Sequence, residues 1–99
     1  MYYVYILHST KDNGFYIGSS SDLKNRVHVH NQGMVISTKG RRPLKLVYYE
    51  VYILKIDAVV REQFLKTSKG RRQLKHQLHH FLRSIGWEDI PTSNDQESR

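Results

Sequence analysis

Two β-prone runs separated by a turn signal place the strongest constraint on the fold of this chain. Residues 2–8 (YYVYILH) and 15–18 (FYIG) are rich in aromatic and β-branched residues, which are typical of strands. The segment Asp12-Asn13-Gly14 between them is typical of a turn. The N-terminal part of the chain is therefore predicted to form an antiparallel β-hairpin.

One short helix and one further strand are predicted after the hairpin. Asp22 is a favourable N-cap and Gly33 is a favourable C′ residue, so together they bound a short helical segment. Residues 34–43 (MVISTKGRRP) are predicted to form a basic loop. Residues 44–53 (LKLVYYEVYI) are the longest β-prone run and are predicted to form the third strand.

Two more helices are predicted in the second half of the chain. Asp57 is expected to cap a helix over residues 58–67, and Gly70 is expected to break the chain after it. Residues 71–83 are predicted to form a helix because its apolar residues recur at helical spacing, namely Leu74, Leu78, Phe81 and Leu82. The predicted order is β-β-α-β-α-α. This is an α+β fold in which a three-stranded antiparallel sheet is flanked by helices.

Positive charge is concentrated on the body of the chain. The 99 residues include 16 Lys and Arg against 9 Asp and Glu, which gives a formal net charge of +7. Four of the acidic residues and one Arg fall in residues 88–99, so residues 1–87 carry 15 positive and 5 negative charges, a net +10. Such a surface attracts polyanions, above all nucleic acid, although a basic surface that only aids solubility is the alternative.

The length and composition predict one folded domain. We expect residues 1–86 to form this domain and residues 87–99 to form an acidic, polar and flexible C-terminal tail. The chain has no cysteine, which excludes disulfides, thiolate zinc sites and cysteine nucleophiles. No apolar run approaches the ~20 residues that span a bilayer, so a cytoplasmic protein is expected.

Glu62 is the acidic residue of the body that lacks a local structural explanation. The other four have one: a turn for Asp12, helix N-caps for Asp22 and Asp57, and a salt bridge to an adjacent strand for Glu50. Glu62 lies in the middle of a predicted helix. An exposed pair with Lys66, four residues later, is the structural alternative to a functional role.

Arg26 and His30 lie four residues apart and therefore share one face of the first predicted helix. A guanidinium and an imidazole are together suited to bind a phosphate. A solvated helix face is the alternative for this pair. Ordinary half-buried strand positions are likewise the alternative to a functional role for Tyr5 and Tyr16.

His76 and His80 have the spacing of metal ligands on a helix. A zinc site needs at least a third ligand, and no carboxylate or cysteine accompanies them on that face. We therefore interpret this segment as a basic helix surface.

These segments together resemble the GIY-YIG nuclease family. Its first and second motifs correspond to Val4-Tyr5-Ile6 and Tyr16-Ile17-Gly18, and residues 16–31 match its pattern YIG-x-(S/T)-x-D-L-x-x-R-x-x-x-H-N. Residues 46–50 correspond to its third strand, and residues 57–62 correspond to its glutamate-bearing helix. Residues 66–72 correspond to the basic junction of its small stand-alone bacterial members. The resemblance spans residues 2–83, and the ordered set is far more specific than any one motif.

The resemblance implies a DNA phosphodiesterase that uses one divalent cation, Mg²⁺ or Mn²⁺. Carried over by position, Glu62 is the metal ligand and Arg26 contacts the scissile phosphate. Tyr5 and Tyr16 flank the attacking water, and one of them acts as the general base or positions the water. His30 matches a position with a role in phosphate contact or proton transfer.

The sequence departs from the family pattern at three places. Val4 stands where the name-giving glycine would be, a change shared by many small members. The family's asparagine after the glutamate has no evident counterpart because residues 63–87 contain no Asn, which leaves Gln73 and Gln77 as candidates. Ser19 stands where some branches have a lysine directly after YIG.

A shared role of Tyr5 and Tyr16 requires a particular register of the hairpin. Tyr5 and Tyr16 share a face of the sheet only if the numbers of paired residues add to an odd value. A two-residue turn at Asn13-Gly14 would satisfy this parity, but it would pair Tyr16 with Lys11, roughly 20 Å along the strand from Tyr5. A wider loop or a bulge is therefore expected around residues 9–14.

The sequence thus predicts a small, metal-dependent DNA endonuclease that acts on single-stranded or structured DNA, with DNA repair as its expected context. Phosphate contacts without base specificity are expected from Lys39, Arg41, Arg42, Lys66, Lys69, Arg71, Arg72 and Lys75. One alternative is a nucleic-acid-binding module with impaired catalysis. Another is a basic RNA-binding protein without catalytic ancestry, in which the tyrosines, Arg26 and Glu62 would not cluster.

Overall fold

The computed structural model describes residues 1–87. Residues 88–99, and with them all of the predicted tail except Trp87, lie outside the described part. The chain divides into two compact units, Met1–Gln63 and Phe64–Arg99, which are described separately below. None of the helices within residues 1–87 has the length and apolarity that a membrane span requires.

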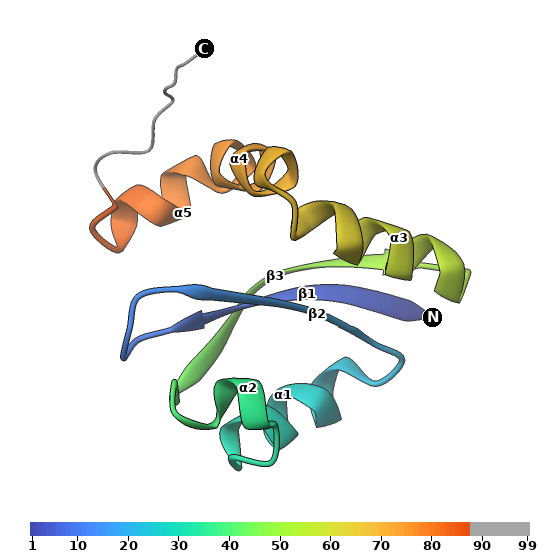
Figure 1. Cartoon of the computed structure of the whole chain (residues 1–99), viewed down its shortest axis with the longest axis horizontal. Helices are drawn as coiled ribbons and strands as arrows, with labels where there is room; N and C mark the ends of the chain where they lie inside the picture. Colours follow the sequence, from blue (N-terminus) through green and yellow to red (C-terminus); the bar gives the residue numbers. More distant parts are fainter. Residues whose placement is uncertain (88–99) are drawn as a thin grey trace. The chain divides into compact units, whose positions relative to one another are not determined.

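The first unit is built on a three-stranded antiparallel sheet (Figure 1). Its strands are β1 (Tyr2–Ser9), β2 (Phe15–Ser20) and β3 (Leu44–Tyr52), in the spatial order β2-β1-β3. The central strand β1 is buried from Val4 to Ser9 because both of its edges and both of its faces are covered. The predicted α+β fold with this sheet is confirmed.

The register of the hairpin places Tyr5 and Tyr16 on the same face of the sheet. Tyr5 pairs with Gly18 and Leu7 pairs with Tyr16, so paired numbers add to an odd value. The connection is the wider loop that this arrangement requires, and it is closed by the Ser9 N–H, which donates to the Gly14 carbonyl at 2.9 Å. Asn13 adopts a left-handed φ of 60° in the turn.

Helices α1 (Leu23–Asn31) and α2 (Ile36–Lys39) cover this face of the sheet (Figure 1). The Asp22 side chain caps α1 by accepting from the Asn25 N–H, as predicted. The segment 34–43, predicted to be a loop, contains the single helical turn α2. A buried cluster fixes α1 to the sheet, and its members are Tyr5, Leu7, Tyr16, Leu23, Val27, Leu44 and Leu46.

Helix α3 (Lys55–Leu65) lies against the opposite face of the sheet (Figure 1). The prediction that Asp57 is its N-cap is wrong, because α3 begins at Lys55 and Asp57 lies in the first turn, where its charge still suits the helix dipole. The predicted salt bridge of Glu50 to an adjacent strand is also wrong. The partner of Glu50 is Arg61 on α3.

The second unit contains α4 (Ser68–Gln77) and α5 (His79–Ser84). The prediction that Gly70 breaks the chain is wrong, because Gly70 lies within the first turn of α4 and its N–H donates to the capping hydroxyl of Thr67 at 3.0 Å. A glycine is required there since a Cβ would lie 2.0 Å from the Phe64 carbonyl oxygen. The predicted continuous helix over 71–83 is instead interrupted at Leu78, which separates α4 from α5.

Candidate active site

A buried chain of hydrogen bonds links Tyr5, His30 and Thr38 beneath α1. The Tyr5 hydroxyl lies 2.9 Å from His30 Nε2, and His30 Nδ1 lies 2.8 Å from Thr38 Oγ1. All three side chains are almost completely buried. Burial, helped by the nearby positive charge of Arg26, lowers the pKa of His30, so the imidazole is neutral at neutral pH.

The bonds of the Thr38 hydroxyl determine which group donates in each of these hydrogen bonds. The Thr38 hydroxyl donates to the Val35 carbonyl at 3.4 Å, so its oxygen is available to accept from His30 Nδ1–H. A neutral imidazole with a proton on Nδ1 accepts at Nε2. The Tyr5 O–H therefore donates to His30, and the phenolic proton points into the protein.

Arg26 and Tyr16 complete this cluster on the α1 face of the sheet. The Tyr16 ring lies 4.9 Å from the His30 ring and 6.3 Å from the Tyr5 ring, measured between centroids. The Arg26 guanidinium lies close to both tyrosine hydroxyls, and its interaction with the Tyr5 hydroxyl is the main cause that raises the pKa of Arg26. A fixed cation thus faces two phenols.

Two opposing influences act on the Tyr5 hydroxyl. Burial is the larger one and raises the pKa of Tyr5, while the nearby Arg26 guanidinium lowers it. Electrostatic interactions with Tyr16 and Glu62 add to the increase. Because the net shift is upward from 10.0, Tyr5 is protonated at neutral pH.

Gly18 allows the Tyr5 hydroxyl to lie directly over strand β2. A Cβ at this position would lie 2.5 Å from the hydroxyl oxygen and 2.7 Å from Cζ of Tyr5, and 3.0 Å from the Tyr16 ring. Real Cβ atoms essentially never approach other atoms below 3.0 Å. The glycine of the second motif is therefore needed for the position of Tyr5.

Glu62 reaches the same strand from α3 on the opposite face. The Ser19 hydroxyl donates to Glu62 Oε1 at 2.6 Å, which fixes the carboxylate beside β2. Within residues 1–87, no group of three or more His, Cys, Asp or Glu side chains is placed to hold a metal ion. A carboxylate is a suitable ligand for a hard cation such as Mg²⁺ or Mn²⁺, which then takes its other ligands from water and substrate.

The structure thus brings together four of the predicted catalytic residues and places the fifth near them. Tyr5, Tyr16 and His30 lie against one another, and Arg26 is close enough to influence the pKa values of Tyr5 and His30. Glu62 influences the pKa of Tyr5 from the other face. Sequence reasoning missed the partners of this group. Thr38 gave no signal within a segment predicted to be a loop, and Ser19 was noted only as a departure from the family pattern.

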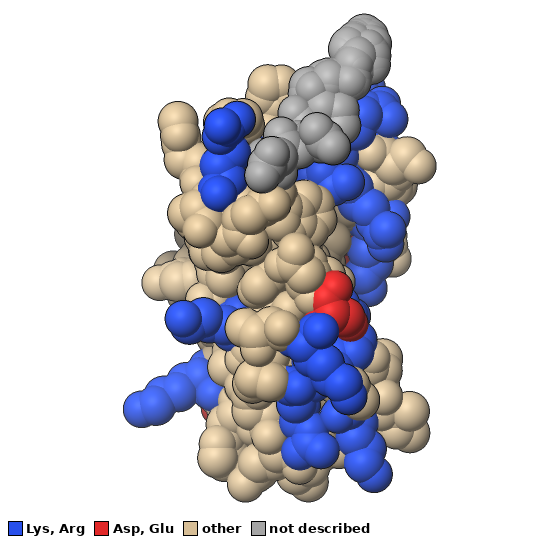
Figure 2. Space-filling view, turned by 90° about the vertical axis from the view of Figure 1, so that its left-hand side faces the viewer, with Lys and Arg blue, Asp and Glu red and all other residues tan. Residues whose placement is uncertain are grey.

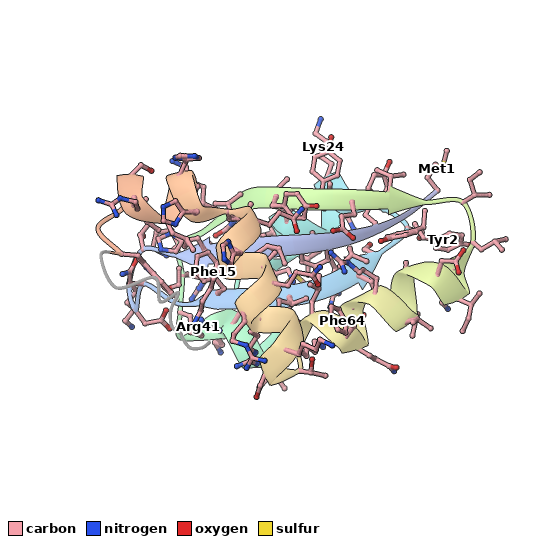
Figure 3. All side chains as sticks on the ribbon, turned by 90° about the horizontal axis from the view of Figure 1, so that it is seen from above. Met1, Tyr2, Phe15, Lys24, Arg41 and Phe64 are labelled. Atoms are coloured by element: carbon pink, nitrogen blue, oxygen red, sulfur yellow. The ribbon has the colours of Figure 1, made fainter. Side chains whose placement is uncertain are left out.

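The predicted DNA-contacting residues of the first unit are Lys39, Arg41 and Arg42. Lys39 and Arg42 are exposed. Arg41 lies beside Phe15 at the hairpin loop, donates to the Phe15 carbonyl and forms an ion pair with Asp12 at 2.6 Å (Figure 3). A phosphate that contacts Arg41 must therefore compete with Asp12.

The other predicted DNA-contacting residues belong to the second unit. Lys66, Lys69, Arg71 and Arg72 are exposed, and Lys75 lies 5.5 Å from the centre of the Trp87 ring. Figure 2 shows that Lys and Arg side chains cover much more of the face in view than Asp and Glu do.

Comparisons with known proteins agree with the motif pattern. The family described as the GIY-YIG catalytic domain matches residues 1–75. A UPF0213 protein of Staphylococcus saprophyticus is 39% identical over 75 residues, which cover 75% of this chain and 90% of the relative. A UPF0213 protein of Clostridium perfringens is 40% identical over 76 residues, which cover 76% and 81%.

One solved structure is also similar. The solution NMR structure of a UPF0213 protein from Bacillus halodurans is 26% identical in sequence, covers 100% of both chains and has a TM-score of 0.46. The extent of the family match and the identity to the two UPF0213 relatives identify the family. This chain belongs to the GIY-YIG family.

Proposed function

We propose that this protein is a DNA endonuclease that hydrolyses phosphodiester bonds with the help of one divalent cation. The observation that carries the proposal is the meeting of two phenols over Gly18, with a buried imidazole bonded to one of them and a guanidinium nearby. A carboxylate lies on the opposite face of the same strand. Membership of the GIY-YIG family supports the same reaction. Hydrolysis of a phosphodiester needs an activated water and stabilisation of the negative charge that develops on the phosphate.

Glu62 is the residue that would hold the cation. Its carboxylate oxygen is a hard ligand, and the hydrogen bond from Ser19 orients it. A bound Mg²⁺ or Mn²⁺ supplies Lewis-acid stabilisation of the charge on the phosphoryl and leaving oxygens. Since the site offers one carboxylate, we expect weak binding that strengthens when a DNA phosphate is present.

Tyr5 is our candidate for the general base. A phenol with a raised pKa is a poor base by itself, but its proton already points at the neutral His30. The attacking water can transfer its proton to the Tyr5 oxygen while Tyr5 transfers its own proton to His30 Nε2. His30 then becomes an imidazolium whose Nδ1–H remains bonded to Thr38.

Arg26 is suited to bind the scissile phosphate. Its guanidinium lies beside both tyrosine hydroxyls, where it can stabilise negative charge that develops on a bound phosphate. Tyr16, which lies against His30, would help to position the water. The exposed Lys and Arg residues predicted above would bind DNA without base specificity, so affinity should fall steeply with salt.

A panel of labelled single-stranded, duplex and branched DNAs tests the proposal. Cleavage is expected with Mn²⁺ or Mg²⁺ and is expected to disappear with EDTA or in the Glu62→Ala variant. We expect single-stranded or branched DNA to be the preferred substrate. If the purified wild-type protein binds these DNAs but cuts none of them with either cation, the proposal is wrong.

A nucleic-acid-binding module with impaired catalysis is the second candidate. The absence of Asn from residues 63–87, where the family pattern has an asparagine, favours it. Gln73 and Gln77, the candidate replacements for this asparagine, belong to α4 in the second unit. The same panel separates the two candidates, because an impaired module would bind DNA with the same salt dependence and show no cation-dependent nicking.

A further inference from the structure

Glu50 and Arg61 form an ion pair that joins strand β3 to helix α3. Both guanidinium–carboxylate contacts are 3.0 Å, from Arg61 Nε to Glu50 Oε1 and from Arg61 Nη2 to Glu50 Oε2. The hydroxyls of Tyr48 and Tyr52 also donate to this carboxylate, at 2.8 and 2.7 Å. The Glu50 carboxylate therefore accepts four hydrogen bonds, which makes this the most extensively bonded carboxylate among the contacts described for residues 1–87.

The Glu50–Arg61 ion pair and the Ser19–Glu62 hydrogen bond involve residues of one row of paired positions across the three strands. Val4 on the central strand pairs with Glu50 on one side and with Ser19 on the other. Glu50 binds Arg61, and Ser19 binds Glu62, the next residue of α3. One turn of α3 is thus attached to both edge strands across a single row of the sheet.

This arrangement fixes the rotation of α3 about its own axis. Consecutive residues of an α-helix point about 100° apart, so Arg61 and Glu62 project toward different strands. A rotation that moved Glu62 away from Ser19 would have to break the bidentate contact between Arg61 and Glu50. Bidentate pairs of this kind are strongly directional.

We propose that Glu50 and Arg61 are positioning residues that hold the Glu62 carboxylate in place for the cation. This inference rests on the proposed function, in which Glu62 is the metal ligand. The Tyr48 and Tyr52 hydroxyls support the same role by fixing the Glu50 carboxylate. Residues that orient a metal ligand typically contribute a factor of about 10 to 100 in metal affinity or activity.

The Glu50→Gln variant tests the inference without relying on catalysis. Mn²⁺ is titrated into the isotope-labelled protein, and paramagnetic broadening of the backbone amide signals of Ser19 and Glu62 is followed by NMR. We expect the variant to need roughly tenfold more Mn²⁺ than the wild type for the same broadening. Asp12→Asn is the matched control, because it removes the other described carboxylate–Arg pair and should leave the Mn²⁺ midpoint unchanged.

Cleavage assays add a second readout that a purely structural role would not change. The Mn²⁺ concentration for half-maximal cleavage should rise by the same factor in Glu50→Gln, and saturating Mn²⁺ should restore the rate to within about twofold of the wild type. DNA affinity measured in EDTA should not change. If Glu50→Gln does not fold, Tyr52→Phe removes a single bond to Glu50 and should shift the NMR midpoint by about two- to threefold in the same direction.

The outcomes distinguish this inference from the proposed function. If wild-type broadening is present and the variants shift it, but no DNA is cut, the positioning role stands and the endonuclease proposal fails. If the Mn²⁺ midpoints of Glu50→Gln and Tyr52→Phe equal the wild-type value, the positioning role is wrong whatever the cleavage assays show. Absence of any wild-type broadening at Glu62 overturns the inference as well.

Discussion

The two faces of the sheet carry different chemistry. The face under α1 holds a buried, uncharged chain of Tyr5, His30 and Thr38, with Arg26 as its cation. The face under α3 holds the carboxylates Glu50 and Glu62, and each forms a bond between a strand and α3. Groups that can move a proton therefore lie on one face, and the group that can hold a metal ion lies on the other.

This separation has an electrostatic reason. A carboxylate placed directly beside the Tyr5 phenol would raise the pKa of that phenol further, since like charges disfavour the phenolate. Glu62 already contributes to this increase from the opposite face, although less than burial does. Strand β2 keeps the two groups apart, and the missing side chain of Gly18 leaves room for the Tyr5 hydroxyl over that strand.

Removal of the carboxylate that we propose to bind the metal ion should have the largest effect. Glu62→Gln keeps the shape of the side chain but not its charge, and we expect the cleavage rate to fall by about a thousandfold or more while DNA affinity stays within about twofold. Single-turnover cleavage and a binding titration in EDTA measure the two quantities. Asp57→Asn, which removes an exposed charge from the same helix, is the control and should cut DNA normally.

Removal of the cation on the other face should have the next largest effect. Arg26→Ala should cost about 3–4 kcal/mol of transition-state stabilisation, by analogy with the loss of one oxyanion donor. This corresponds to a loss of a few hundredfold in kcat/KM. The neighbouring Lys24→Ala variant removes an exposed charge from α1 and should reduce only binding. A loss below about tenfold for Arg26→Ala would make Arg26 an ordinary surface contact.

A pair of glycine substitutions tests the close approach of the Tyr5 hydroxyl to strand β2. Gly18→Ala would place a Cβ 2.5 Å from the Tyr5 hydroxyl, so the phenol must move away from His30 or the strand must shift. We expect about a hundredfold loss of cleavage and a decrease of about 1–3 kcal/mol in the free energy of unfolding. Gly40→Ala is the matched control, because no atom lies within 4 Å of its Cβ and its φ of −84° suits any residue.

The strands and the first helix could be predicted from the sequence because their signals are local. Asp22 caps α1 and Asp12-Asn13-Gly14 forms the turn, as expected from residue type alone. The boundaries in the second half could not be predicted in this way. Gly70 resembles a helix breaker, but it is needed for a close approach to the Phe64 carbonyl, which only the folded chain reveals.

The candidate site, like the fold, could be predicted from the sequence only in part. Tyr5, Tyr16, Arg26 and His30 could be selected from motif spacing, because the register of the hairpin and the helical period bring them together. Their partners depend on contacts between distant segments, since Thr38 binds His30 from a segment without a helical pattern. Ser19 and Glu62 are 43 residues apart in the sequence, and no local rule connects them.

The smallest expected effect concerns stability and tests whether the buried chain of Tyr5, His30 and Thr38 is uncharged. Because the pKa of His30 is lowered in the folded protein, the unfolded chain binds a proton near pH 6.5 that the folded chain binds only at lower pH. The stabilisation is therefore present above pH 6.5 and is lost as the pH falls below it, by at most about 1.4 kcal/mol per pH unit.

Urea unfolding at several pH values between 5 and 8 measures this dependence for the wild type and for His30→Gln. The variant should be less stable overall at pH 7.5 but should lose less stability on acidification. Equal losses in both proteins would mean that His30 is protonated as easily in the fold as in the unfolded chain, and the lowered pKa of His30 would then be wrong.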